Sequence, residues 1–558
     1  MKKSILLTLG VVLSMGMSTF ALAAAEPPKG EMAGPQLNRT MEMLERARVA
    51  QQIEEDRARQ SSKIVDERTE EKAEESQVQF KVTGVDYGKS EVLTDEQIQA
   101  ITSEYLNKDI TVSDLYQMLG RINNLYAEGG YVTCKAFLPP QKVTGGVIKI
   151  LLVEGKTGKV SVVGNKTTTT DYVTRRIDLP SGQVENLHHL NDKLTYFNGT
   201  NDAQVRVMLE AGQEPGTTDF VLQVYEPQQI NHTIFTDNAG NYSSGMYRAG
   251  YFLNVKSLTG SRDSLTMGTI WAEGLKSFSA VYSVPVSPSG TQLSLAYSTN
   301  STKIIKGDAY DSGLDIRGHS SAYSATLRQP WVVNETTRSE IGVEYNYQSS
   351  SNDIARAYKY KDKTNEITPY FSHTTYGKSH IFYQKYSYAA FGDFKRDKEA
   401  GMKENNVHYY KANAYYQKAY KHGQMISARL DGQIEESNNL SSSKEFYIGG
   451  MNSVRGYRES FLSADRGFSS SLEYQFPICK DRTHNMFLFY DYGIIGRDGE
   501  TGFDDRVLQS VGLGIKSSWN KHIYSSLCIA FPLIREFPVM EQKKVSKTRL
   551  HFLVSGQM

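Results

Sequence analysis

The chain has 558 residues, enough for several domains, and its formal net charge of +1 argues against a nucleic-acid-binding protein. Its three cysteines, Cys134, Cys479 and Cys528, are odd in number and far apart, which is typical neither of a disulfide framework nor of a metal site. The sequence also lacks the short motifs of zinc proteases, serine hydrolases and phosphate-binding loops, so we expect no catalysis, no metal and no cofactor.

The amino terminus predicts a secretory signal peptide over residues 1–25. Lys2 and Lys3 precede an apolar stretch over residues 5–17, and small residues follow up to a cleavage point between Ala23 and Ala25. The apolar stretch is short and contains Ser, Thr and Gly, so it has neither the length nor the composition of a membrane-spanning helix. We therefore expect the mature chain to be exported from the cytoplasm.

Residues 26–76 predict an isolated helix followed by a linker. Strong helix formers favour a helix between Leu37 and Arg59. Its thin apolar face is formed by Leu37, Met41, Leu44 and Ile53. Because this face is imperfectly periodic, the helix cannot sit in a dry core, but it could lie in solvent or inside a polar pore. The charged stretch 61–76 is typical of a flexible linker.

Residues 77–154 predict a small unit with the order β-α-α-β-β. Its expected elements are a strand over 77–85, a helix from Thr94, a helix over 112–128, and strands over 131–138 and 146–154. Thr94 and Gln97 have the spacing of a capping box. Gly129 and Gly130 are expected to end the second helix.

Residues 155–227 repeat this order. The expected elements are a strand over 159–165, a short helix over 170–179, a helix marked by Leu187, Leu190, Leu194 and Phe197, and strands over 203–211 and 220–225. The second helix is expected to end at Asn198 and Gly199. The matching order and matching strand ends predict a duplicated domain. Two unrelated small α+β domains are the alternative.

The region over residues 228–558 has a different sequence periodicity. Helical periodicity disappears, and short alternating runs occur over 292–297, 341–347, 406–416 and 486–490. Polar loops such as 299–318 and 392–405 separate them. Pro285, Pro330, Pro477 and Pro532 each end a run, and we expect all four to mark tight turns at one rim of a barrel, with the long loops at the other rim.

These patterns favour a membrane β-barrel over a soluble β-protein. At roughly 20 residues for a strand with its loop, the region holds about 16 antiparallel strands. The chain has 35 tyrosines and only 3 tryptophans, and tyrosine is an amphipathic ring that forms girdles at membrane interfaces. A soluble sandwich or propeller would not explain the signal peptide, the tyrosines and the unequal loops together.

Two short motifs in this region are candidates for a functional site. They are Val454, Arg455, Gly456 and Tyr457, and, on a later alternating strand, Asp491 and Gly493. Taken alone, the first motif could be a turn with an exposed arginine. A buried arginine would need a carboxylate partner, because its guanidinium is costly to desolvate and presents a fixed fork of donors.

Together, the motifs and the strand pattern resemble the outer-membrane protein transporters, the superfamily that contains BamA and the two-partner secretion pores. In that superfamily the arginine lies on a loop folded into the barrel and pairs with an aspartate of the barrel wall. The resemblance implies a lumenal ion pair between Arg455 and Asp491.

The order of signal, helix, two repeats and barrel is similar to that of the two-partner secretion transporters of the ShlB/FhaC/HecB type, over essentially the whole mature chain. The segment from Asp237 to Gly240, followed by Arg248, also resembles the start of their barrels. The resemblance implies that residues 77–154 and 155–227 are POTRA domains in the periplasm of a Gram-negative-type bacterium. It implies that residues 228–558 form an outer-membrane barrel, with the helix of residues 26–76 as its plug.

The same resemblance implies a function. The chain would recognise a secreted exoprotein of the TpsA type through its POTRA domains and export it by type V secretion, with outer-membrane lipid as its other partner and as a monomer. A BamA-type assembly factor is the alternative, although such proteins usually carry more POTRA repeats and lack the leading helix. One departure from the pattern is the end of the chain at Gly556, Gln557 and Met558, where outer-membrane proteins usually have an aromatic residue.

Overall fold

The computed structural model describes residues 32–59, 79–311, 313–354, 358–389, 391–396, 405–406, 408–436, 440–496, 506–520, 522–537 and 543–558. The expected signal peptide and linker lie outside these residues. The chain forms two compact units. One combines the N-terminal helix with the region from Gln228 onward, and the other spans Ser62–Pro227.

The first repeat is a mixed α+β unit built around the helix α4. Its elements are β1 (Gln79–Lys81), β2 (Gly84–Asp86), α3 (Asp95–Thr102), η2 (Ser103–Tyr105), β3 (Asp109–Thr111), α4 (Val112–Glu128), β4 (Cys134–Phe137), β5 (Val147–Lys149) and β6 (Leu151–Glu154). Leu115, Leu119, Ile122 and Tyr126 of α4 are buried in its core. The bounds of α4 and the capping box of Thr94 with Gln97 agree with the sequence prediction.

The strand expected over 77–85 is instead two short strands. Val82 N donates to the Lys108 carbonyl at 3.1 Å, and Thr83 N donates to the Gly146 carbonyl at 2.8 Å. The chain therefore changes partners at this point, from β3 to the parallel strand β5. β3 is only three residues long and has no counterpart among the expected elements.

The second repeat has the same plan. Its elements are β7 (Lys156–Val163), α5 (Thr170–Thr174), α6 (Leu187–Thr200), β8 (Gln204–Ala211) and β9 (Thr217–Tyr225). β9 pairs in parallel with β7 and antiparallel with β8. In the first repeat, β5 likewise pairs in parallel with β2, and β6 pairs antiparallel with β4. The duplication is therefore present in the strand pairing as well as in the sequence. α6 ends later than expected, at Thr200.

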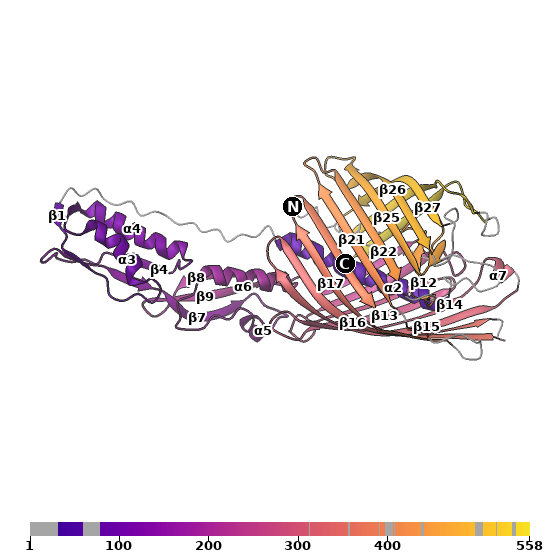
Figure 1. Ribbon diagram of the computed structural model, residues 1–558, viewed down its shortest axis with the longest axis horizontal. Coiled ribbons are helices and arrows are strands. Elements are labelled where there is room, and N and C mark those ends of the chain that lie inside the picture. Colours follow the sequence, from indigo (N-terminus) through magenta and orange to yellow (C-terminus); the bar gives the residue numbers. More distant parts are fainter. Residues whose placement is uncertain are drawn as a thin grey trace. The chain divides into compact units, whose positions relative to one another are not determined.

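The region from Gln228 onward forms a closed barrel (Figure 1). Its strands are β10 (Ile230–Asp237), β11 (Arg248–Lys256), β12 (Ser264–Ala272), β13 (Leu275–Pro285), β14 (Gln292–Lys303), β15 (Ile316–Val333), β16 (Thr337–Ile354), β17 (Tyr358–Tyr376), β18 (His380–Ala389), β19 (Phe391–Arg396), β20 (Asn405–Asn406), β21 (Tyr409–Ala419), β22 (Met425–Glu435), β25 (Arg466–Pro477), β26 (His484–Gly496), β27 (Val507–Ser518), β28 (Ile523–Pro532) and β31 (Arg549–Gln557). The loops carry α7 (Asp308–Asp311), β23 (Phe446–Ile448), β24 (Leu462–Ala464), β29 (Glu536–Phe537) and β30 (Lys543–Lys544).

β18 and β19 both pair with β17 and together form one strand of the wall. β21 pairs with β18 and β20 pairs with β19, so β20 and β21 together form the next strand. Counted in this way, the described residues form 16 antiparallel strands, as predicted. β31 pairs with β28 and β10 and closes the barrel, and Gly556 and Gln557 belong to this strand. None of the helices in the described part of the chain has the length and apolar character that a membrane crossing requires.

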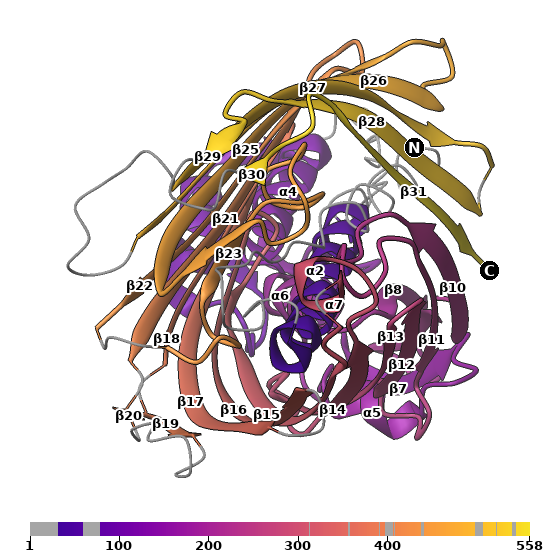
Figure 2. The same cartoon turned by 90° about the vertical axis from the view of Figure 1, so that its right-hand side faces the viewer.

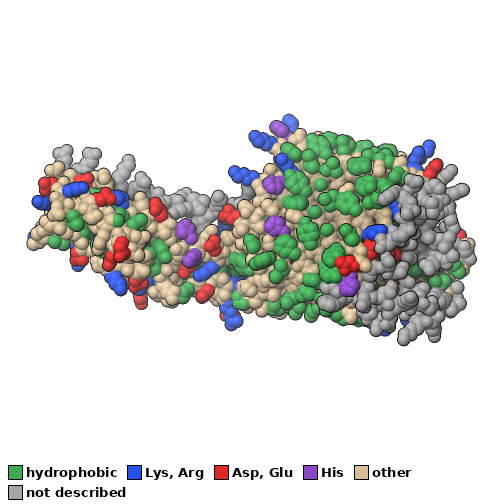
Figure 3. Space-filling model, in the orientation of Figure 1, with side chains coloured by type: hydrophobic (Ala, Val, Ile, Leu, Met, Phe, Trp, Pro, Cys, Tyr) green, Lys and Arg blue, Asp and Glu red, His purple; other side chains and the backbone are tan. Residues whose placement is uncertain are grey.

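The two faces of the barrel wall differ in polarity. In β25, Ser469 and Gln475 are 3% and 4% exposed on the lumen side, whereas Leu472 is 52% exposed on the outside. Hydrophobic side chains gather over the outer surface of the barrel (Figure 3). A soluble sandwich would bury such side chains, so this alternation is the pattern of a membrane barrel.

The structure corrects two expectations about the loops. Strands β14 and β15 extend into the stretch 299–318, and β19 extends into 392–405, because polar residues occur at the ends of barrel strands as well as in loops. The prolines do not all lie at one rim. Pro285 and Pro477 end strands at the rim where β10 begins, the proximal rim, but Pro532 ends β28 at the opposite, distal rim. Pro330 lies inside β15 beside a register shift, where a strand does not need its missing N–H.

The helix α2 (Ala33–Arg59) lies inside the barrel, as Figure 2 shows. At its start, Asn300 Nδ2 donates to the Ala33 carbonyl at 2.8 Å. Near its end, the Tyr376 hydroxyl donates to Asp56 at 2.5 Å. Asn300 is close to the distal rim and Tyr376 to the proximal rim. The helix therefore runs along the lumen from one rim toward the other.

Candidate functional site in the barrel lumen

The candidate site is built on the loop that joins β22 to β25. This loop contains β23 and β24 and folds into the lumen, where Val454 and Tyr457 are fully buried. They pack in one apolar cluster with Ile448, Phe461, Leu462, Leu508 and Phe537. The barrel wall and the loop β28–β31 thus supply a core for a loop that would otherwise have none.

The structure brings Arg455 and Asp491 together. Arg455 Nε lies 2.7 Å from Asp491 Oδ2, and Arg455 Nη2 lies 2.8 Å from Asp491 Oδ1. The backbone N–H of Arg455 donates to the same carboxylate at 3.0 Å. The Asp491 side chain is fully buried and that of Arg455 is 11% exposed. The guanidinium therefore binds the carboxylate in bidentate fashion, and the backbone N–H of Arg455 adds a third hydrogen bond.

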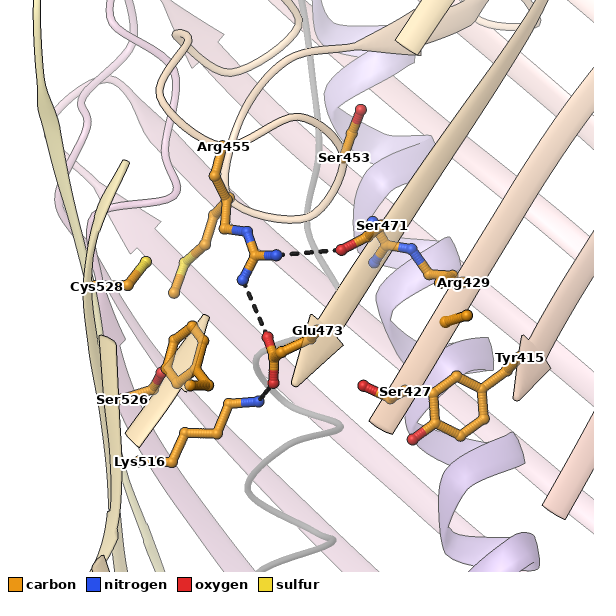
Figure 4. A pocket seen from close by; sticks show the side chains of 13 residues that line it. Tyr415, Ser427, Arg429, Ser453, Arg455, Ser471, Glu473, Lys516, Ser526 and Cys528 are labelled. Atoms are coloured by element: carbon orange, nitrogen blue, oxygen red, sulfur yellow. Dashed lines mark hydrogen bonds and ion pairs between the residues drawn. The ribbon is translucent and has the colours of Figure 1, made fainter. Parts of the chain in front are cut away.

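Three further residues complete a charge-balanced network (Figure 4). Arg455 Nη1 donates to Glu473 at 3.1 Å, and Glu473 also accepts from Lys516. Ser471 Oγ accepts from Arg455 at 3.1 Å and donates to Asp491 at 2.7 Å. Two cations and two anions therefore lie together, which removes most of the cost of burying them.

The guanidinium also stacks on the barrel wall. Its central carbon lies 3.4 Å from the ring centre of Phe489, on the same strand as Asp491. Sequence reasoning missed Ser471, Glu473 and Lys516. A usable signal was present for Glu473, which stands between Leu472 and Tyr474 and so alternates with outward apolar residues. The partnership with Lys516 could not be found without the strand order.

Glycines allow the loop to approach the wall at two points. Gly456 has a φ of +93°, and an added Cβ would lie 3.0 Å from Pro532. A Cβ on Gly493 would lie 2.8 Å from Val454 Cγ2, so this position on β26 leaves space for the loop. The Tyr457 hydroxyl lies 2.7 Å from the Ile534 carbonyl oxygen and thus ties the loop to the segment after β28.

A second buried ion pair stands at the start of the barrel. Arg248 Nε and Nη2 lie 2.9 Å and 2.7 Å from the carboxylate oxygens of Asp237, its cross-strand partner. Both side chains are almost fully buried. Next to them, Arg39 of α2 donates to Asn241 at 2.6 Å. The helix is therefore anchored beside this pair.

Charged contacts hold α2 along its length. Glu45 accepts from Lys385 at 2.9 Å, Arg46 lies 3.8 Å from Asp431, and Asp56 lies 3.7 Å from Arg338. Asn38 Nδ2 donates to the Ser443 carbonyl in the inward loop at 2.5 Å. Apolar contacts add to these, since Met43 packs with Phe235 and Leu553 and Ile53 packs with Tyr376 and Ile381. The helix is thus held both by polar contacts, which water and ions can replace, and by two small apolar clusters.

Known proteins with similar sequences and structures share this architecture. The chain is 25% identical over 477 residues to the heme/hemopexin transporter protein HuxB of Haemophilus influenzae. The match covers 80% of this chain and 82% of that protein. It is 22% identical over 405 residues to the outer membrane transporter CdiB of Dickeya dadantii, covering 70% and 71% of the two chains.

Among solved structures, CdiB from Escherichia coli superimposes with a TM-score of 0.67 at 15% identity and covers 94% of this chain and 99% of its own. BamA from Haemophilus ducreyi lacking POTRA domains 1–3 gives a TM-score of 0.51 at 13% identity and covers 86% and 100%. These two likenesses concern the fold.

Two family profiles match the sequence. The profile of the ShlB-type POTRA domain matches residues 80–155, which is the first repeat. The profile of the haemolysin secretion/activation protein ShlB/FhaC/HecB matches residues 216–517, more than half of the chain. The chain belongs to the ShlB/FhaC/HecB family of haemolysin secretion/activation proteins.

Proposed function

We propose that this protein is an outer-membrane pore that recognises one partner exoprotein in the periplasm and exports it to the cell surface by two-partner secretion. The observation that carries the proposal is the combination of a closed barrel, a lumenal helix and a ShlB-type POTRA domain in one chain of this family. The members of the family are transporters. We propose that this chain works in the same way, as a monomer and without a catalytic step.

Under this proposal, residues 77–154 and 155–227 are two POTRA domains that receive the unfolded partner. β8 lies at one edge of its sheet, and its residues Met208 and Leu209 are 44% and 41% exposed. An exposed edge can bind an extended chain through main-chain hydrogen bonds, with modest side-chain specificity. Because such a client loses entropy on ordering, the affinity is expected to be roughly micromolar.

We further propose roles for the lumenal residues. Residues 26–76 contain the plug, α2, which occupies the lumen at rest and leaves it during export. The pair Arg455–Asp491, together with Glu473 and Lys516, fixes the inward loop against the wall of the pore. The charged contacts along α2 support this division, because water and ions can replace them when the plug leaves.

An assembly factor of the BamA type shares this barrel fold, and it would give a different result on deletion. The test is to delete the gene and compare secreted, periplasmic and outer-membrane proteins. We expect one large exoprotein to disappear from the cell surface and medium and to return on complementation. A general loss of outer-membrane barrels, with secretion of every exoprotein unchanged, would contradict the proposal.

A further inference from the structure

The lumenal wall beneath the start of α2 is uncharged. Alternate residues of β14, β15 and β16 face the lumen here, whereas residues between them, such as Tyr323 at 53%, are exposed on the outside. Strand pairing aligns the lumenal residues in three rows: Ser298, Ala322 and Gln348; Asn300, Ser320 and Ser350; Thr302, Gly318 and Asn352. All nine are buried, and none is charged or aromatic. We call these nine residues the neutral wall.

The neutral wall holds α2 by its main chain. Asn300 Nδ2 donates to the Ala33 carbonyl at 2.8 Å, and Gln348 Nε2 donates to the Gly34 carbonyl at 3.0 Å. The N–H of Ala33, in the first turn of the helix where it has no intrahelical partner, donates to Asn352 Oδ1 at 3.3 Å. None of these three hydrogen bonds depends on a side chain of α2, whose position in the lumen Figure 2 shows.

The carboxamides of the neutral wall have hydrogen-bonding capacity that α2 does not use. Asn300 Oδ1 and Gln348 Oε1 are buried and accept no hydrogen bond from any residue that the structure describes. A buried carboxamide normally uses its acceptor as well as its donors. The helix cannot supply donors here, because beyond its first turn its N–H groups bond to its own carbonyls. An extended chain keeps the N–H and the C=O of each peptide group free, so it can satisfy both sides of a carboxamide.

The spacing of the neutral wall also suits an extended chain. Its rows are two residues apart along the strands, about 6.6–6.8 Å, and an extended polypeptide presents equivalent peptide groups at the same interval. The smallest side chains, Gly318, Ser320 and Ala322, stand on the middle strand, and the carboxamides stand on the strands to either side. The middle strand therefore leaves room for side chains of any type, while the flanking carboxamides reach the main chain.

We propose that the neutral wall binds the main chain of the exported polypeptide, in an extended conformation, after α2 has left the lumen. The carboxamides of Asn300, Gln348 and Asn352 pair with its peptide groups and do not read its sequence. Because the wall is uncharged, segments of either charge pass it without being retained. The inference rests on the proposed function and adds where and through which groups the pore contacts its partner.

The first experiment is disulfide capture in intact cells with the full-length protein. Its probe is the exoprotein that disappears when the gene is deleted, with single cysteines placed along it and a carboxy-terminal domain that folds in the periplasm and stalls export. Ser320→Cys, in the middle of the neutral wall, should capture the stalled exoprotein. The wild type gives the background from the natural cysteines.

Thr374→Cys is the matched control for this position. Thr374 of β17 is also buried in the lumen, beside Tyr376 near the other end of α2, but it lies outside the neutral wall. It should capture less exoprotein than Ser320→Cys. Equal capture at the two positions would overturn the inference, because it would show passage through the lumen without a preferred contact.

A second experiment removes the hydrogen-bonding groups. Asn300→Leu with Gln348→Met keeps the size of both side chains, and it should reduce capture at Ser320→Cys about tenfold and slow export, because losing two neutral hydrogen bonds has an effect of that order. Gln475→Met should change neither quantity, since Gln475 is a similarly buried glutamine of β25 outside the neutral wall. Heat-modified gel mobility checks that each barrel is folded.

The direction of the change in export separates this inference from a wall that only anchors the plug. Unchanged or faster export by the double variant would show that the neutral wall serves α2 alone and would overturn the inference. Met208→Cys on β8 reports the earlier contact with the POTRA region. Capture there without capture at Ser320→Cys would overturn this inference alone, whereas capture at neither position would contradict the proposed function as well.

Discussion

Replacing Arg455 by alanine should impair export while the barrel remains inserted. Asp491 has four donors, three from Arg455 and one from Ser471, and the substitution leaves only the backbone N–H of residue 455 and the Ser471 hydroxyl. The local charge changes from two cations and two anions to one cation and two anions. Breaking a buried pair costs about 3–5 kcal/mol.

Because Asp491 keeps two donors and the lumen admits water, we expect the lower end of this range. A cost of about 3 kcal/mol corresponds to roughly a hundredfold loss of the docked loop relative to other conformations. Arg455→Lys should also be defective, because an ammonium cannot donate to both carboxylate oxygens in the same geometry. The assay is the amount of exoprotein on the cell surface, with heat-modified gel mobility as the check that the barrel is folded.

A double-mutant cycle with Asp491→Ala isolates the interaction. Removing both partners should cost less than the sum of the two single changes, since no unpaired charge remains. Arg458→Ala is the matched control, because this exposed arginine of the same loop stacks on Tyr242 and lies outside the network. Additive defects of Arg455→Ala and Asp491→Ala would refute the reasoning.

Three further predictions concern the plug, the loop contact and the POTRA region. Deleting α2 should raise single-channel conductance in planar bilayers, and unchanged conductance would show that the helix does not obstruct the pore. Gly493→Ala should displace Val454 and reduce export, whereas Gly496→Ala, whose nearest neighbour is the flexible side chain of Arg466, should have little effect. Partial burial alone would raise the pKa of Glu226, but hydrogen bonds from residues 166–168 lower it to about 2. The stability that this carboxylate contributes is therefore present above its ordinary pKa of about 4.3 and is lost as the pH falls toward 2. The thermal midpoint of the POTRA region should fall as the pH is lowered across this range. The fall should be smaller in Glu226→Gln.

Local sequence signals were sufficient where short-range physics determines the structure. The bounds of α4 and the capping box at Thr94 could be predicted, because caps and helical periodicity depend on residues a few positions apart. The strand alternation followed from the same kind of pattern, and the total of 16 strands followed from the length of the region at roughly 20 residues for a strand with its loop. The resemblance of the two motifs to a known superfamily then suggested that Arg455 and Asp491 meet.

Features that depend on pairing between distant segments could not be predicted. Pro532 was expected in a tight turn at the same rim as the other prolines. It instead ends β28 at the distal rim, where it lies next to Gly456 of the inward loop. Lys516 joins the site only because β26 lies between β25 and β27. Neither Pro532 nor Lys516 has a local pattern that separates it from ordinary strand-end or surface residues.

The most direct test of the account is to lock the plug in place. A Cβ built on Gly34 lies 3.3 Å from Cβ of Ser350 on β16, close to the separation of about 3.5–4.5 Å in a disulfide. Cells that carry Gly34→Cys with Ser350→Cys should lose export of the exoprotein on oxidation and regain it on reduction. Gly34→Cys alone should export under both conditions, which controls for the natural cysteines. Full export by the oxidised, cross-linked double variant would contradict the claim that the partner leaves through the lumen that α2 occupies.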